Sequence, residues 1–243
     1  MLMFEPNEFH LQMTYVQRLL ATRKVDRALA MLSETLEVIN LDVEPDAMKK
    51  SEILLRRASC YLIKDDTVLT VKDIVSGMVL LIDDDCSEQE APSQPSVAVQ
   101  LVKKIFSDIE AINVIMEFTA KTLSADVLNS SKSLSKPDIE YGVNFFRCMM
   151  ELKPHALEPK IKYINCLLLS GNYREALIIT ENLMERPEHS KNPALLLARG
   201  TCNKHLGNKV RLNWINIIVF PISRISINNI CALFIYIDAI KKA

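Results

Sequence analysis

Residues 166–176 read CLLLSGNYREA, and this stretch indicates the fold class. Apolar residues recur at helical spacing before and after it, and Gly171 between them marks a tight turn. The same order of helix and short turn continues on both sides, where Pro154 and Pro187 end helices because proline cannot extend the hydrogen-bond ladder. The predicted helices span residues 138–152, 159–170, 173–184 and 193–206. We therefore expect an all-α chain of helices joined by short turns.

Two small residues mark a repeat in this region. Gly142 and Ala176 lie at equivalent places in successive long helices and are 34 residues apart, which is the length of a tetratricopeptide repeat. Gly142 is followed by Phe146 and then Pro154, in the small, aromatic, proline order of that repeat, and Gly200 fills a further small position. The chain resembles the tetratricopeptide repeat (TPR) family. The resemblance implies an α-α superhelix of stacked antiparallel helix pairs, a TPR-like solenoid, whose first helices line a concave peptide-binding groove.

The same pattern recurs with weaker matches toward the N-terminus. Residues 15–32 predict a first helical pair, and residues 57–77 predict a second. An amphipathic helix over 97–123 supplies a middle repeat, and the serine-rich stretch 124–137 is expected to be a weak helix at best. The predicted division of the chain is divergent N-terminal pairs (1–82), an acidic flexible loop (83–96), a degenerate middle repeat (97–136), the best-matching region (137–209) and an apolar tail (210–243).

The tail at 210–243 departs from the repeat and from the composition of the rest of the chain. After Gly207 the pattern requires an aromatic residue and an alanine to begin the next helix, and residues 209–212 supply neither. Lys-Val-Arg at 209–211 is also encoded by a splice-donor consensus, so the leading hypothesis is a non-native read-through extension. A membrane tail anchor and a divergent terminal helix that caps the stack are the alternatives. Genomic DNA without GT after the Lys209 codon would contradict the read-through hypothesis.

A second resemblance is to the repeats of J-domain co-chaperones, and it rests on residues 151–154, 166–176 and 198–202. The sequence contains no His-Pro-Asp triplet, which marks the J-domain itself. Some members of this family bind the acidic C-termini of heat-shock chaperones with a carboxylate clamp of Lys, Asn and Arg side chains. Asn165 and Arg56 match clamp positions, but Ile161 and Glu52 replace the two lysines. A complete clamp is therefore not expected.

Polar side chains one helical turn apart predict an inner wall against which a peptide could bind. This spacing places the members of each pair on the same helix face. The predicted wall is mildly basic and rich in hydrogen-bonding groups, which suits an extended acidic or polar peptide of a partner protein. The alternative interpretation is that these are solvated positions on amphipathic helices. The candidate peptide-binding residues are Arg56, Ser59, Lys162, Asn165, Thr201, Lys204 and His205.

Composition excludes several classes of protein. The 243 residues include 29 basic and 30 acidic side chains, and the formal charge of −1 gives no reason to expect a nucleic acid partner. The six cysteines include no CxxC pair, and the four histidines are not spaced with them as zinc ligands, so we expect neither a metal nor another cofactor. The N-terminus lacks the basic and apolar regions of a secretory signal, which favours the cytoplasm.

Motifs of common catalytic sites are missing, because the sequence has no P-loop, no GxSxG and no HExxH. The nearest approach to a nucleophile and its base is Cys148, His155 and Cys166, without a third group to orient the histidine. We therefore expect a non-catalytic TPR scaffold or adaptor that binds other proteins. A chaperone-linked adaptor and a subunit of a trafficking or cell-cycle assembly are the alternatives within this class, and an enzyme is the alternative outside it.

Overall fold

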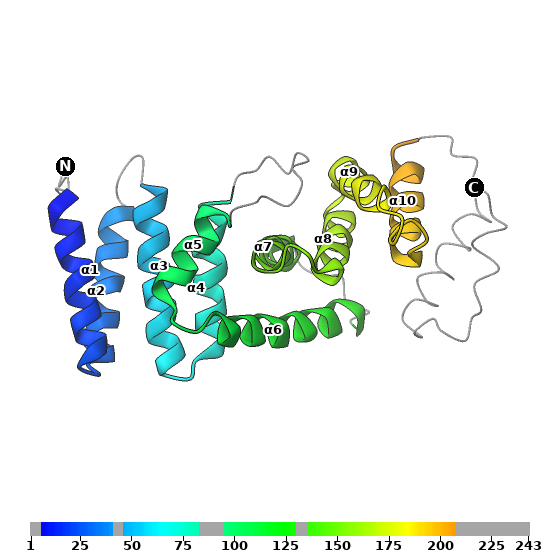
Figure 1. Ribbon diagram of the computed structural model, residues 1–243. Coiled ribbons are helices and arrows are strands. Elements are labelled where there is room, and N and C mark those ends of the chain that lie inside the picture. Colours follow the sequence, from blue (N-terminus) through cyan, green and yellow to red (C-terminus); the bar gives the residue numbers. More distant parts are fainter. Residues whose placement is uncertain (1–5, 41–45, 83–94, 130–135, 208–243) are drawn as a thin grey trace. The chain divides into compact units, whose positions relative to one another are not determined.

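The structure is a computed structural model that describes residues 6–40, 46–82, 95–129 and 136–207 (Figure 1). Within these ranges it is all-helical without strands, and neighbouring helices pack in pairs, so the predicted all-α class is confirmed. The helices are α1 (Pro6–Ala21), α2 (Val25–Asn40), α3 (Ala47–Ile63), α4 (Thr67–Val79), α5 (Val97–Ile105), α6 (Ile109–Asn129), α7 (Lys136–Leu152), α8 (Leu157–Ser170), α9 (Tyr173–Met184) and α10 (Pro193–His205).

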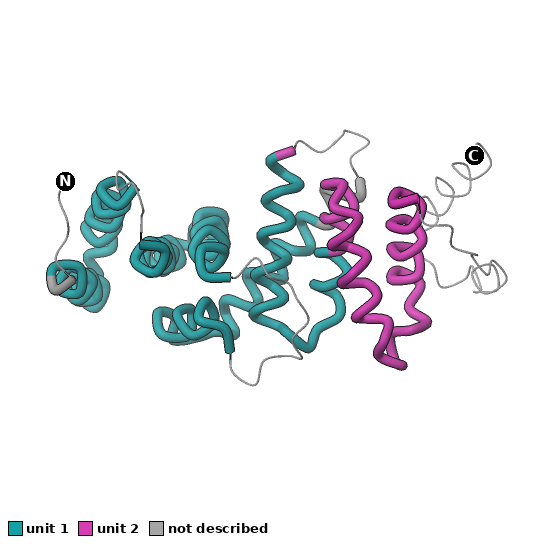
Figure 2. The backbone as a smooth tube through the Cα atoms, turned by 90° about the horizontal axis from the view of Figure 1, so that it is seen from above, with its two compact units in different colours: residues 1–123, 137–163 teal, residues 124–136, 164–243 magenta. Residues whose placement is uncertain are grey.

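The chain is divided into two compact units (Figure 2). Unit 1 contains residues 1–123 and 137–163, and unit 2 contains residues 124–136 and 164–243. The helices α1 to α5 therefore belong to unit 1, and α9 and α10 belong to unit 2. The chain passes from one unit to the other within α6, between Lys136 and Pro137 at the start of α7, and within α8.

Three of the turns between helices share one backbone geometry. Arg23, Asp65 and Gly171 have φ angles of 59°, 58° and 83°, in the left-handed region. In each turn the following N–H donates to the carbonyl five residues earlier, which is the Schellman arrangement that closes a helix. These bonds join Lys24 N to Leu19 O (2.9 Å), Asp66 N to Tyr61 O (3.0 Å) and Asn172 N to Leu167 O (2.9 Å). The pairs α1 and α2, α3 and α4, and α8 and α9 are therefore joined by equivalent turns.

The core of unit 1 begins between its first three helices. Helical spacing gives each of them an apolar face, and these faces pack together away from water. The buried side chains of this core are Phe9, Met13, Val16, Leu19, Ala28, Leu32, Leu36, Ile39, Ile53, Leu54 and Cys60.

The helices α3 and α4 approach each other closely at Gly77. A Cβ atom on Gly77 would lie 3.2 Å from Leu55 Cγ and 3.3 Å from the carbonyl oxygen of Ser51, so the glycine leaves room for the neighbouring helix. The Ser51 hydroxyl donates to the carbonyl of Gly77 at 2.8 Å. Farther along the pair, Arg57 donates to both carboxylate oxygens of Asp73, from Nε at 2.6 Å and from Nη2 at 2.8 Å. This contact combines close packing with a bidentate ion pair.

The region after residue 95 corrects one prediction. The sequence predicts a single helix over 97–123, but the structure has two, α5 and α6. Phe106 takes an extended conformation and is buried, which ends α5. The Asp108 carboxylate then accepts hydrogen bonds from the backbone N–H groups of Glu110 (3.0 Å) and Ala111 (3.2 Å) and so begins α6 as an N-terminal cap. The helix α6 continues to Asn129, beyond the point where we expected helical structure to weaken.

Other predicted helix ends agree with the structure. The helix α9 has the predicted bounds, and α7 ends at Leu152, just before the predicted stop at Pro154. Most of the predicted acidic loop and the apolar tail lie outside the described residues. Among the helices that the structure describes, none combines the length and the hydropathy that a membrane span requires.

The shared turn geometry leads to a paired stability prediction. A side chain in the left-handed region costs about 1 kcal/mol, a cost that glycine avoids. We expect Arg23→Gly to raise the melting temperature and Gly171→Ala to lower it, each by about 2–4 °C. Thermal unfolding followed by circular dichroism measures both shifts. Shifts of the same sign in the two variants would contradict the assignment of equivalent turns.

Candidate functional site

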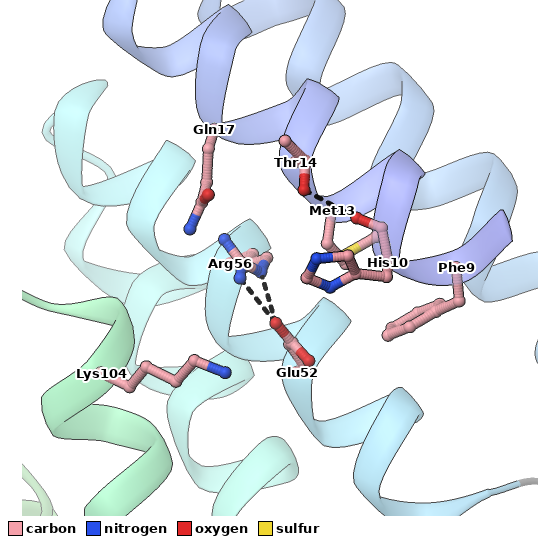
Figure 3. Close-up of a pocket in the computed structure, with 8 residues that line it drawn as sticks. All are labelled: Phe9, His10, Met13, Thr14, Gln17, Glu52, Arg56 and Lys104. Carbon is pink, nitrogen blue, oxygen red and sulfur yellow. Dashed lines mark hydrogen bonds and ion pairs between the residues drawn. The ribbon is translucent and has the colours of Figure 1, made fainter. Parts of the chain in front are cut away.

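A pocket of about 240 Å³ lies in unit 1 between α1, α3 and α5 (Figure 3). These helices alternate along the chain, and neither α2 nor α4 contributes to the lining. The buried side chains Phe9 and Met13 supply its apolar part. The lining residues are Phe9, His10, Met13, Thr14, Gln17, Glu52, Arg56 and Lys104.

The polar side of the pocket on α1 follows from helical spacing. His10, Thr14 and Gln17 are four and then three residues apart, so one face of α1 carries all three side chains. The Thr14 hydroxyl donates to the carbonyl of His10 at 2.9 Å and is thereby fixed to its own helix. His10 and Gln17 are exposed and line the pocket, and the Gln17 side chain points toward Arg56 in Figure 3.

An ion pair within α3 forms the centre of the pocket. Arg56 donates to Glu52 Oε1 from Nε at 3.0 Å and from Nη2 at 2.6 Å. Both side chains are largely covered, with 7% of Arg56 and 16% of Glu52 exposed. Placing the glutamate one turn before the arginine is the favourable order on a helix. Because little water screens the pair, removing either charge would leave the other poorly compensated.

Lys104 brings a further positive charge from α5. It lies in the last turn of that helix, where a cation is favoured by the helix dipole. Its side chain is exposed and points toward Glu52 and Arg56 in Figure 3, and it forms no ion pair with any described residue. Since Glu52 and Arg56 balance each other, Lys104 leaves the pocket with an excess of positive charge.

The structure distributes the seven predicted peptide-binding residues over both units. Arg56, Ser59 and Lys162 belong to unit 1, and the other four belong to unit 2. Only Arg56 lines the pocket. The Ser59 hydroxyl donates to the carbonyl of Arg56 at 2.7 Å, so it serves its own helix, and Lys162 is half-buried on α8. That all seven form one wall stays a prediction.

Five polar residues of the pocket were not predicted from the sequence: His10, Thr14, Gln17, Glu52 and Lys104. The spacing of His10, Thr14 and Gln17 could have predicted a polar face on α1, because residues four and three apart lie on the same side of a helix. Lys104 had no such signal. Its contribution depends on the end of α5 at Phe106, which the sequence did not reveal.

The predicted residues of unit 2 lie on α8 and α10. Asn165 and Lys204 are exposed, and the Thr201 hydroxyl donates to the carbonyl of Leu197 at 2.9 Å. The His205 ring stacks on Tyr173, with centroids 4.2 Å apart and an interplanar angle of 3°. Beside this stack is an open hollow of about 400 Å³, lined by Gly171, Asn172, Tyr173, Arg174, Glu175 and Leu206. It is more open to solvent than the pocket in unit 1.

Cys148, the nearest candidate for a nucleophile in the sequence, lies in the interior of unit 1. The Cys148 side chain is fully buried, and its thiol donates to the carbonyl of Val75 at 3.8 Å. Burial raises the pKa of Cys148 to about 12, and it raises the pKa of Cys60 and of Cys202 to about 11. A nucleophilic cysteine requires a lowered pKa, so Cys148 lacks the property that activates a thiol. No group of three or more metal-ligating side chains is present in the part of the chain that the structure describes.

The chain matches no family model and no curated protein.

The raised thiol pKa values predict slow alkylation in the native protein. At mildly alkaline pH the buried Cys148 thiol stays protonated, and the thiolate is the reactive form. We expect iodoacetamide to leave Cys148 unmodified in the native chain and to modify it after unfolding in urea, as measured by mass spectrometry of peptides. Equal modification under both conditions would contradict the buried placement.

Proposed function

We propose that this chain is a non-catalytic adaptor that holds an extended segment of a partner protein against α1, α3 and α5. The observation that carries the proposal is that alternate helices alone line the pocket. Successive helix pairs thereby turn their first helices toward one site, which is the arrangement implied by the resemblance to the TPR family. The equivalent turns at Arg23, Asp65 and Gly171 support membership of that family as part of the proposal.

The size and lining of the pocket favour side chains of a polypeptide over a small-molecule ligand. Sites for small molecules generally enclose about 300–1,000 Å³ and are mostly apolar. This pocket is smaller, at about 240 Å³, and six of its eight lining residues are polar or charged. A peptide can place one or two side chains in such a pocket while its backbone crosses the neighbouring helices.

The charge of the pocket favours an acidic or polar segment. Lys104 lacks a partner among the described residues, and a ligand carboxylate beside it would gain a charge-assisted hydrogen bond. The four described cysteines, Cys60, Cys148, Cys166 and Cys202, are buried thiols, which supports the cytoplasm as the proposed compartment.

Selection from a display library of short random peptides tests this proposal. We expect the full chain to enrich peptides whose affinity falls about tenfold or more in Lys104→Glu, a loss of about 1.4 kcal/mol or more, because the variant reverses the unpaired charge. Fluorescence anisotropy with the enriched peptides measures the loss. Lys121→Glu, at an exposed position of α6 outside the pocket, is the matched control and should leave affinity unchanged. Failure to enrich any peptide, or equal losses in both variants, would contradict the proposal.

A further inference from the structure

The ion pair in the pocket leaves one carboxylate oxygen unused. Both hydrogen bonds from Arg56 reach Glu52 Oε1, and Glu52 Oε2 has no partner among the residues that the structure describes. Figure 3 shows this second oxygen directed away from Arg56. A carboxylate oxygen accepts hydrogen bonds and donates none, so Oε2 can take only a donor from a ligand.

Covering this oxygen without a donor would be costly. Only 16% of the Glu52 side chain is exposed, and a ligand that enters the pocket would remove the water that remains there. An ionised group that loses its water and gains no hydrogen bond destabilises the complex. A basic side chain avoids this cost because its ammonium or guanidinium group donates to the carboxylate and carries the opposite charge.

Glu52 also limits how much negative charge the pocket accepts. One ligand carboxylate can bind Lys104, but a second would approach the Glu52 carboxylate and be repelled. The aliphatic part of a basic side chain, in contrast, can pack on the apolar lining supplied by Phe9 and Met13. The arrangement of charges thus favours one acid and one base over two acids.

We infer that the pocket recognises a pair of neighbouring opposite charges in the partner segment, with the acidic side chain bound by Lys104 and the basic side chain bound by Glu52 Oε2. The inference rests on the proposed function and adds Glu52 as a residue that determines specificity. It differs from a carboxylate clamp, because a clamp uses lysine at this position and receives an acidic terminus.

The test compares the full chain with Glu52→Gln in the same peptide selection. Glutamine keeps an oxygen acceptor for Arg56 but loses the negative charge. We expect the wild-type chain to enrich peptides with adjacent acidic and basic residues. We expect Glu52→Gln to lose the preference for the basic residue. When that basic residue of an enriched peptide is replaced by glutamate, we expect Glu52→Gln to bind the resulting peptide about tenfold more tightly than the wild-type chain does. Glu37→Gln, at an exposed position of α2, is the matched control.

Three outcomes separate this inference from the proposed function. Enriched peptides that depend on Lys104 but contain no basic residue would overturn the inference and leave the proposed function standing. An unchanged charge preference in Glu52→Gln would also overturn it. Absence of any enriched peptide would overturn both. If Glu52→Gln does not fold, fluorescence anisotropy can compare the affinities of the wild-type chain for the paired-charge peptide and for its all-acidic form. We expect tighter binding of the paired-charge peptide, and equal affinities would overturn the inference.

Discussion

The close contact between α3 and α4 is the constraint on which the described part of unit 1 depends. Gly77 removes the side chain that would hold the helices apart, and Ser51 uses the resulting proximity for a hydrogen bond. The bidentate pair of Arg57 and Asp73 then fixes how the two helices face each other. Because only 5% of the Asp73 side chain is exposed, Arg57 compensates a charge that little water reaches.

The same helix that is fixed in this way supplies the centre of the pocket. The helix α3 packs on α2, α4 and α5, and it carries both Glu52 and Arg56. Its contact with α4 holds one face, so the opposite face is presented to α1 and α5 in a defined orientation. A site whose charged groups are already oriented loses less side-chain freedom when a ligand binds, and this favours selectivity by charge.

The local signals in the sequence predicted much of the fold and only part of the site. Gly171 and Pro154 predicted where two helices end, and Pro193 predicted where one begins, because these residues restrict the backbone locally. The structure has these helix boundaries within a few residues. The break at Phe106 depends on burial of that side chain in tertiary structure, so periodicity across 97–123 did not reveal it. The sequence predicted Arg56 as a peptide-binding residue, but it indicated Glu52 only as an acidic residue in place of a clamp lysine. The meaning of that carboxylate depends on Lys104, which another helix brings close.

Hydrogen exchange of the native chain, measured by mass spectrometry, tests the central role of the contact between α3 and α4 most directly. Amides in the last regions to open exchange most slowly. We predict the slowest exchange in unit 1 at residues 53–58 of α3 and 71–75 of α4, with α1 and α5 exchanging sooner. Exchange in α3 and α4 as fast as in α1, or faster, would contradict the view that their contact supports the rest of the unit and its pocket.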